Sequence, residues 1–238
     1  MPLFLPMTAE ECSLHQNRID IWEFSLKDLP DWAMSILDED ERHRAQRFHF
    51  PRHQRRFAVS HAMLRAILGR YLGQSPKELV FTYGPHGKPG IKTNYNLEFN
   101  LTHSRELALL AIGQQFPLGI DIEFFSARPY LGLAKTVFSP MEVAGLLQLP
   151  FWMQPLAFFH IWSQKEALIK ACGLGLSYPT KAFNVPVLPS TKTSIEDRKH
   201  HKHWQMIPFM PLVNCSAALC CESSIQHIRY IRVNPLDF

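Results

Sequence analysis

The chain has 238 residues, of which 46% are hydrophobic and 19% charged, and its formal net charge is +4. This composition is ordinary for a folded globular protein and excludes a largely disordered chain. No run of about eighteen apolar residues occurs, so no membrane span is predicted, and the short apolar start lacks the basic region of a signal peptide. The five cysteines form no CxxC pair, so we expect reduced thiols in a cytoplasmic protein.

The first half of the chain alternates between strand and helix patterns. Residues 19–24 alternate apolar and polar side chains and predict a strand. Residues 38–48 have helical character, and residues 53–71 predict a long amphipathic helix that stops near Gly69 and Gly73. Further strands are expected at residues 80–83, 97–102 and 107–112, with a tight turn at residues 84–90.

The second half repeats this order in outline. After a strand at residues 118–124, the pattern predicts helices at residues 138–149 and 158–172 and strands at residues 204–209, 216–221 and 225–233. The polar residues 189–203 are expected to form a surface loop. The predicted fold class is therefore α+β, with two similar α+β halves at residues 1–115 and 116–238.

The strand at residues 118–124 places two carboxylates on one face. Because side chains alternate along a strand, Ile120 and Ile122 point toward a core while Asp121 and Glu123 point the other way, side by side. Two neighbouring carboxylates repel each other, and Mg²⁺ would compensate them because it prefers carboxylate oxygen and retains waters for a phosphate substrate. The alternative is a pair of solvated acids on an exposed strand.

The helix at residues 158–172 carries a second charged pair. Glu166 and Lys170 are four positions apart and share one helix face. The glutamate can serve as a third metal ligand or as a base, and the lysine can meet a phosphate. The alternative is a surface salt bridge, worth only about 0.3–0.5 kcal/mol. Gly173 and Gly175 follow directly and permit a tight loop near a ligand.

Arginines are concentrated near the start of the long predicted helix. They are Arg42, Arg44, Arg47, Arg52, Arg55 and Arg56. Such a cluster can bind an anionic small molecule, an acidic protein or nucleic acid, or it can be a solvated helix face. The chain lacks the known nucleic-acid-binding motifs and their interleaved aromatic side chains, so we do not expect a nucleic-acid partner.

Several motifs together resemble the Sfp-type 4′-phosphopantetheinyl transferases. In chain order they are Tyr83-Gly84, Gly87-Lys88-Pro89, Phe99-Asn100-Leu101-Thr102-His103-Ser104, Gly119-Ile120-Asp121-Ile122-Glu123, Phe138-Ser139-Pro140-Met141-Glu142 and the run from Trp162 to Lys170. The resemblance covers residues 44–183. It implies two halves related by a pseudo-two-fold axis, with coenzyme A in the cleft between them, and a monomeric enzyme.

The resemblance also implies a catalytic centre. Asp121 and Glu123 would hold Mg²⁺, and Glu166 would complete the metal site or act as the base on the substrate serine. Lys170 and His103 would contact the phosphates of coenzyme A. These last three residues, Glu166, Lys170 and His103, are the expected catalytic groups.

The nucleotide end of coenzyme A would meet a second set of side chains. Ser104 would contribute beside the phosphate, Lys88 would lie against the adenine end, and Arg44 and Arg56 would lie near the 3′-phosphate. Two positions depart from the family pattern: Glu41, where relatives often have a basic residue, and Phe57, where a hydroxyl residue sometimes stands.

The activity implied is the transfer of phosphopantetheine from coenzyme A to a serine of an acyl carrier protein or a peptidyl carrier domain. One alternative is a Mg²⁺-dependent phosphohydrolase that uses the same acids with water as the nucleophile. The other is a basic nucleic-acid-binding protein. Activity without a carrier protein would favour the first alternative, and salt-sensitive binding to DNA or RNA would favour the second.

Overall fold

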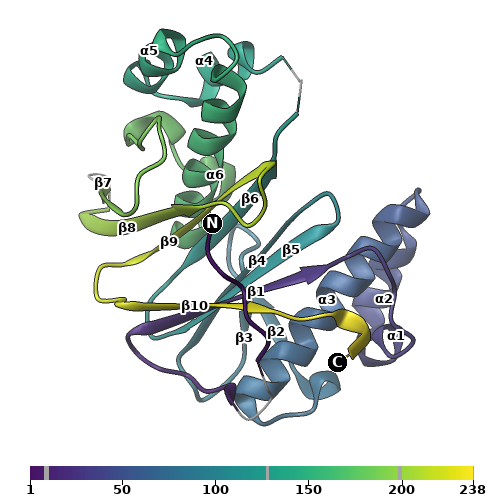
Figure 1. Ribbon diagram of the computed structural model, residues 1–238. Coiled ribbons are helices and arrows are strands. Elements are labelled where there is room, and N and C mark those ends of the chain that lie inside the picture. Colours follow the sequence, from purple (N-terminus) through teal and green to yellow (C-terminus); the bar gives the residue numbers. More distant parts are fainter. Residues whose placement is uncertain (8–10, 127–128, 198–199, 238) are drawn as a thin grey trace.

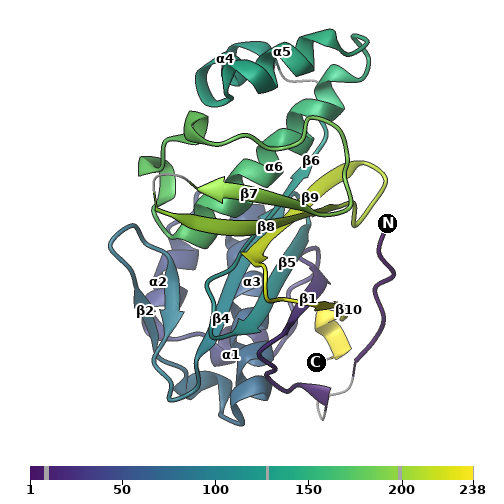
Figure 2. The same cartoon turned by 90° about the vertical axis from the view of Figure 1, so that its left-hand side faces the viewer.

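Two four-stranded sheets lie between two long helices in the computed structural model, which describes residues 1–7, 11–126, 129–197 and 200–237 (Figure 1). The short helices of the two ends are far apart. Helices α4 and α5 lie at the opposite end of the molecule from α1 and α2 in both views (Figures 1 and 2). No helix in the described part of the chain is long and apolar enough to cross a membrane.

The first sheet has the strand order β10-β1-β5-β4. The bounds are β10 (His227–Arg232), β1 (Arg18–Ser25), β5 (Leu107–Gln114) and β4 (Leu97–Ser104). The pair β1–β10 is parallel and the other pairs are antiparallel. One face of this sheet packs on helix α3 (Pro51–Leu72), where Trp22, Phe24 and Phe99 are buried. This sheet and helix form an α+β core to which the first half of the chain contributes all elements except β10.

Helix α3 has clear start and stop signals. Proline occupies its first position, and Gly73 ends it in a left-handed conformation with φ of 62°. The shorter elements around it are α1 (Ala33–Ile36), α2 (Glu39–Gln46), η2 (Pro76–Glu78) and the hairpin β2 (Phe81–Tyr83) and β3 (Pro89–Ile91). In α2, Asp38 and Glu41 form a capping box, so Glu41 is a structural residue.

The second sheet has the strand order β6-β9-β8-β7 and is antiparallel throughout. The bounds are β6 (Gly119–Phe124), β9 (Cys215–Glu222), β8 (Lys202–Phe209) and β7 (Thr193–Asp197). Helix α6 (Gln154–Cys172) packs on one face of it. The remaining helical segments are α4 (Leu131–Val137), α5 (Pro140–Gln148), η3 (Gly175–Ser177), η4 (Thr180–Ala182) and η5 (Pro235–Asp237).

A third apolar core joins the two sheets. Ile19 and Ile21 of β1 pack there with Ile120 and Ile122 of β6, and all four are almost completely buried. The predicted orientation of β6 is therefore confirmed: its isoleucines face the other sheet, and its acids face α6. Because the first sheet packs on one face of β6 and α6 packs on the other, β6 runs through the middle of the molecule. Asp121 is therefore largely shielded from water.

The predicted α+β class is confirmed, but two segments differ from expectation. The segment at residues 189–203 is not a loop throughout, because residues 193–197 form β7, with Ile195 buried; residues 198–199 lie outside the described part. The last predicted strand joins the first sheet rather than the second. The division into residues 1–115 and 116–238, and the pseudo-two-fold axis, stay predictions.

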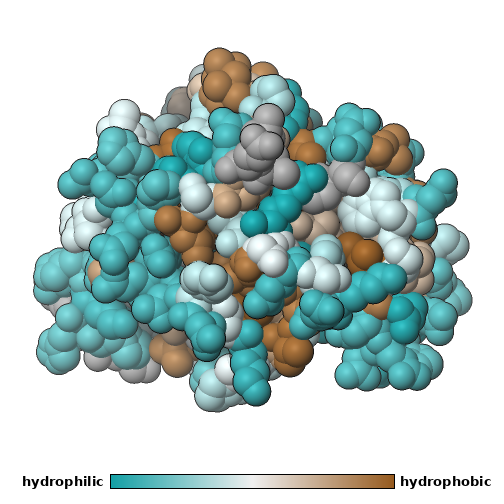
Figure 3. All heavy atoms as spheres, turned by 90° about the horizontal axis from the view of Figure 1, so that it is seen from below, coloured by the Kyte–Doolittle hydropathy of each residue, from teal (hydrophilic) through white to brown (hydrophobic). Residues whose placement is uncertain are grey.

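The face seen from below in Figure 3 is largely hydrophilic and is interrupted by small apolar groups. All five cysteines are free thiols, as expected, and three of them, Cys215, Cys220 and Cys221, are buried in β9.

Candidate active site

The two sheets meet along β4 and β6, and polar side chains of β4 cross this seam. Asn100 Oδ1 accepts a hydrogen bond from the Ile120 amide at 2.8 Å, and Ser104 Oγ accepts one from the Phe124 amide at 3.3 Å. Between them, Thr102 Oγ1 donates to Asp121 Oδ1 at 3.0 Å. Because these three residues alternate along β4, they share one face and hold β6 in register with the first sheet.

Asp121 and Lys170 form a close ion pair at this seam. Lys170 Nζ lies 2.6 Å from Asp121 Oδ1 and 3.0 Å from Thr102 Oγ1. Asp121 is only 5% exposed, and its other oxygen, Oδ2, has no hydrogen-bond partner among the described residues. A buried carboxylate oxygen without a partner is energetically unfavourable. A further positive group beside this oxygen would stabilise Asp121.

Two glutamates surround this pair. Trp162 Nε1 donates to Glu123 Oε1 at 3.2 Å. Burial, and next the charge of Asp121, raise the pKa of Glu123 to about 7. Burial and the same charge raise the pKa of Glu166, against the lowering effect of Lys170. Both carboxylates are thus destabilised in their charged form, and a nearby cation would offset this effect.

The donor set suits a hard cation. Asp121, Glu123 and Glu166 offer only carboxylate oxygens, and Mg²⁺ prefers such ligands. In the described ranges, no group of three or more His, Cys, Asp or Glu side chains is already arranged to hold a metal ion. The unpartnered Oδ2 and the two glutamates with raised pKa values nevertheless match what a bound cation would stabilise. The three predicted ligands therefore fit Mg²⁺ by their chemistry.

A cleft of about 320 Å³ opens beside Glu166 and Lys170, and it is also lined by the turn at residues 86–89 and by Gly173 and Gly175. Gly173 has φ of 70°, and a Cβ there would lie 3.2 Å from the Lys88 side chain. Glycine is therefore required for both the backbone conformation and the close approach. The loop predicted to permit a nearby ligand does border the cleft.

Lys88 lines this cleft, but its ammonium group is occupied. Nζ donates to the carbonyl oxygens of Leu118 at 3.0 Å and Ala171 at 3.2 Å, and burial lowers the pKa of the side chain. Lys88 thus links the β2–β3 hairpin to β6 and α6. The close contact of these last two elements also depends on Gly119, where a Cβ would lie 2.1 Å from the Ala167 carbonyl oxygen.

The predicted basic residues lie in two places. His103 is exposed to solvent on one side. Partial burial lowers its pKa most, and the positive charges of Lys170 and Arg56 lower it further. Arg56 Nη2 lies 2.6 Å from Glu106 Oε1. Arg44 is exposed and borders a separate hollow. The structure thus brings His103 and Arg56 toward Lys170, whereas Arg44 borders a separate hollow.

A buried ion pair supports the helix that carries Glu166. Lys165 Nζ lies 2.9 Å from Glu142 Oε2 and also donates to the carbonyl oxygens of Thr180 and Phe183. Glu142 in turn forms a capping box with Ser139 at the start of α5. Within the motif that ends at Lys170, Lys165 therefore fixes α6 against α5, whereas Glu166 and Lys170 face the acids of β6.

Sequence reasoning missed Thr102 and the polar role of Trp162. Thr102 contacts both Asp121 and Lys170, whereas Ser104, the predicted phosphate contact, accepts a hydrogen bond from the Phe124 amide. The alternation of Asn100, Thr102 and Ser104 was the available signal, because it shows that all three share a face.

Comparison with known proteins identifies the family. Residues 117–218 match the model of the 4′-phosphopantetheinyl transferase superfamily, and residues 21–115 match that of the 4′-phosphopantetheinyl transferase N-terminal region. The chain is 35% identical over 222 residues to the 4′-phosphopantetheinyl transferase HetI of Nostoc, which covers 92% of this chain and 90% of the relative. The chain belongs to the 4′-phosphopantetheinyl transferase superfamily.

Other members of the superfamily match at comparable levels. The 4′-phosphopantetheinyl transferase Sfp of Bacillus subtilis is 30% identical over 190 residues, which is 77% of this chain and 84% of the relative. The transferase ffp of Bacillus subtilis is 29% identical over 206 residues, or 84% and 91% of the two chains. These matches support a phosphopantetheinyl transferase and give no support to the phosphohydrolase or nucleic-acid-binding alternatives.

Proposed function

We propose that this protein is a Mg²⁺-dependent transferase that moves 4′-phosphopantetheine from coenzyme A to a serine hydroxyl of an acyl carrier protein or a peptidyl carrier domain. The observation that carries the proposal is the convergence of Asp121, Glu123, Glu166 and Lys170 from β6 and α6 beside the cleft, in a chain of this superfamily.

Coenzyme A is assigned to the cleft next to Lys170. Lys170 and His103 would donate to its phosphate oxygens, which become more negative as the transfer proceeds. The turn at residues 86–89 borders the same cleft, so the adenine end is placed there. Arg56 is assigned to the 3′-phosphate because it lies near His103, and the more distant Arg44 adds positive charge on that side.

Asp121, Glu123 and Glu166 would hold Mg²⁺. When bound, the ion would supply Lewis-acid stabilisation of the charge on the phosphate oxygens. The orphaned Oδ2 of Asp121 is the strongest support for this assignment, because a buried oxygen without a partner needs a positive neighbour.

The serine hydroxyl of the carrier must lose its proton as it attacks phosphorus. A bond forms between serine Oγ and phosphorus, and the bond from phosphorus to adenosine 3′,5′-bisphosphate breaks. Glu166 is half-buried with a raised pKa, so it suits the role of general base, and the same carboxylate could instead be a metal ligand. Lys170 orients Asp121 and donates to the phosphate.

Intact-mass spectrometry of an apo carrier protein tests the function. We expect a mass gain of one phosphopantetheine with coenzyme A and Mg²⁺, and no gain after chelation of the metal. The variants D121A and E166A should each abolish transfer while their circular dichroism spectra remain unchanged. Breakdown of coenzyme A without any carrier modification would instead support the phosphohydrolase.

We also propose that the enzyme acts as a monomer in the cytoplasm. Five free thiols, three of them buried, suit a reducing compartment. Light scattering coupled to size-exclusion chromatography should give the mass of one chain, and a mass of two chains would contradict the monomer.

A further inference from the structure

One carboxylate of the turn between β4 and β5 binds two neighbouring arginines of α3. Glu106 Oε1 accepts hydrogen bonds from Arg56 Nη2 at 2.6 Å and from Arg56 Nε at 3.2 Å. Arg55 Nη2 lies 3.2 Å from the same oxygen and 3.3 Å from Oε2. Hydrogen bonding from Arg56 is the largest cause that lowers the pKa of Glu106, so this carboxylate is charged near pH 7.

The backbone around Glu106 is held in place. Arg105 and Glu106 form a two-residue hairpin turn between the paired residues Ser104 and Leu107, and Arg105 has φ of 52°. The Leu26 amide donates to the Glu106 carbonyl oxygen at 2.9 Å. The turn is thus tied to the segment after β1, and only the side chain of Glu106 is free to change its partners.

The two arginines are not equivalent. Arg55 Nε also donates to the Leu26 carbonyl oxygen at 3.1 Å, so Arg55 is held by the backbone as well as by Glu106. Among the described residues, the hydrogen bonds of the Arg56 side chain all go to Glu106 Oε1. Arg56 can therefore turn toward another anion, and Arg55 would keep Glu106 paired when it does so.

Arg56 belongs to a group of basic side chains around His103. After burial, the charges of Lys170, Arg56 and His61 each lower the pKa of His103, and Asp121 opposes them. Such a concentration of positive charge attracts a phosphate group. The side chain of Arg56 is 21% exposed, so a ligand can reach it. This is the place assigned above to the 3′-phosphate of coenzyme A.

We propose that Glu106 competes with the 3′-phosphate of coenzyme A for Arg56, and that this competition limits the preference of the enzyme for coenzyme A over 3′-dephospho-coenzyme A. The inference rests on the proposed function. The two molecules share the phosphate at which transfer occurs and differ only in the 3′-phosphate. No bond forms or breaks at that group, so the effect of Glu106 belongs to binding rather than to the chemical step.

The charges determine the direction of the effect. Arg55, Arg56 and Glu106 together carry a net charge of +1, which would be +2 without the carboxylate. A phosphate monoester carries a charge of about −1.5 to −2 near pH 7, so Glu106 repels it as well as occupying Arg56. Because Arg56 and Glu106 are 21% and 28% exposed, solvent limits the effect to that of a surface ion pair, up to about fivefold in affinity.

The same competition acts on the product. Adenosine 3′,5′-bisphosphate keeps the 3′-phosphate after transfer, so it binds Arg56 as coenzyme A does. When Glu106 returns to Arg56, it helps to release this product. Removal of the carboxylate charge should therefore strengthen product inhibition together with substrate binding.

The variant E106Q tests the proposal because glutamine keeps an acceptor oxygen for Arg56 and removes the charge. We expect the KM for coenzyme A to fall about three- to fivefold, with the KM for 3′-dephospho-coenzyme A unchanged. The inhibition constant of adenosine 3′,5′-bisphosphate should fall by a similar factor. The control is E78Q, which makes the same charge change at an exposed residue beyond the other end of α3 and should behave like the wild type.

Calorimetry provides a readout that does not require transfer. Adenosine 3′,5′-bisphosphate and adenosine 5′-phosphate are titrated into the wild type, E106Q, R56A and the double variant R56A/E106Q. E106Q should tighten binding of the bisphosphate alone. In the R56A background, E106Q should give no gain, because the arginine for which Glu106 competes is absent.

Other outcomes would overturn the competition. Weaker binding of the bisphosphate to E106Q would show that Glu106 positions Arg56 for the phosphate. Equal gains for both nucleotides, a gain that persists in R56A/E106Q, or the same gain in E78Q would show a general effect of charge. Absence of carrier modification by the wild type, with the expected calorimetric pattern, would refute the proposed function and leave the competition at Arg56 supported.

Discussion

Thr102 is an uncharged side chain that bonds to both members of the Asp121–Lys170 pair. Its hydroxyl donates to Asp121 Oδ1 and accepts from Lys170 Nζ, so it helps to fix the position of the carboxylate relative to the ammonium group at the seam between the sheets. Hydrogen bonds to charged groups are worth about 1.5–3 kcal/mol, which is more than a neutral pair contributes. Loss of this hydroxyl should therefore disturb the active site more than the fold.

The variant T102V keeps the shape of the side chain and removes the hydroxyl. We expect the rate of carrier modification to fall about 10- to 100-fold, because Asp121 and Lys170 lose the group that orients them. The matched control is S104A on the same strand, which removes only an acceptor for the Phe124 amide and should reduce the rate less than about threefold. The opposite ranking of the two variants would favour Ser104 as the phosphate contact.

His160 makes stability depend on pH. Its pKa is lowered by burial to about 4 from the ordinary 6.5. As the pH falls below 6.5, His160 becomes protonated in the unfolded chain, whereas in the folded protein it stays neutral until about pH 4. The free energy of unfolding therefore falls as the pH decreases through this range. Between pH 7 and pH 4.5, the wild-type protein should lose about 2 kcal/mol more stability than H160N, as measured by urea denaturation. Parallel pH profiles of the two proteins would contradict this expectation.

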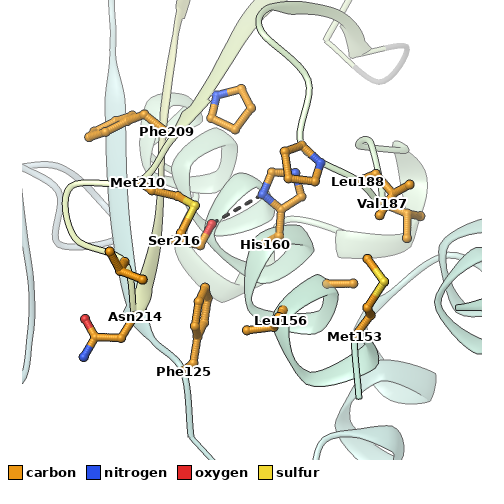
Figure 4. A pocket seen from close by; sticks show the side chains of 14 residues that line it. Phe125, Met153, Leu156, His160, Val187, Leu188, Phe209, Met210, Asn214 and Ser216 are labelled. Atoms are coloured by element: carbon orange, nitrogen blue, oxygen red, sulfur yellow. Dashed lines mark hydrogen bonds between the residues drawn. The ribbon is translucent and has the colours of Figure 1, made fainter. Parts of the chain in front are cut away.

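Different residues of helix α6 contact different parts of the protein. Glu166 and Lys170 face the acids of β6, Lys165 faces α5, and the absence of a side chain at Gly119 allows β6 to approach the backbone of Ala167 closely. Ala157 and His160 line an apolar pocket at the start of this helix (Figure 4). Because a single helix carries all of these groups, a tilt of α6 would move Glu166, Lys170 and the pocket wall together.

The buried pair Glu142–Lys165 holds this helix in place. E142Q leaves the Lys165 ammonium, which is 1% exposed, without its charge partner, and breaking a buried pair on one side costs about 3–5 kcal/mol. We expect a comparable fall in the free energy of unfolding by urea titration. The exposed pair His43–Glu39 provides the control, since E39Q should leave stability unchanged. A small effect of E142Q would mean that water or the Thr180 and Phe183 carbonyls are sufficient for Lys165.

The regular elements with strong periodicity were predictable from the sequence, and the weaker ones were not. Helices α3 and α6 and strands β4, β5 and β6 lie where their apolar patterns indicate. Strand β7 was missed because only Ile195 marks its buried face, and its other side chains are polar. The partner of β10 could not be predicted, since pairing between residues 18 and 227 depends on contacts that no local pattern encodes.

In the candidate site, too, local sequence patterns predicted some features, whereas others required the fold. The position of Asp121 and Glu123 on one face of a strand follows from alternation, and the pairing of Glu166 with Lys170 on one helix face follows from the helical repeat. The contact of Lys170 with Asp121 across two elements required the fold. The ammonium group of Lys88 bonds to two backbone carbonyls, which a sequence does not reveal because carbonyls belong to every residue.

The C-terminal strand ties the two ends of the chain together. Strand β10 pairs in parallel with β1, Arg229 Nη2 lies 2.7 Å from Asp20 Oδ2, and Ile231 is buried on α3. Asp20 is only 2% exposed, so its carboxylate depends on such partners. The first sheet therefore contains β10 at one edge, whereas the candidate active site lies at its opposite edge, on β4.

A chain that ends at Glu222 should lose cooperative folding as a whole. Truncation there removes β10, exposes the edge of β1 and withdraws Arg229 from Asp20. We expect a broad thermal transition and aggregation, measured by circular dichroism and light scattering. A chain that ends at Pro235 retains β10 and the bond from Trp32 to the Pro235 carbonyl oxygen, and it should unfold like the full protein. A sharp transition in the shorter chain would show that the sheets fold without β10.

The position of β10 in the sequence also determines when the first sheet can complete its folding during synthesis. The ribosome makes β1 (Arg18–Ser25) long before β10 (His227–Arg232), the strand that covers its edge. Until β10 has been made, β1 presents an open edge, which is the feature that recruits chaperones and promotes association between nascent chains. The first sheet can close only after β10 has left the ribosome, so all the elements between β1 and β10 are synthesised while this edge is open.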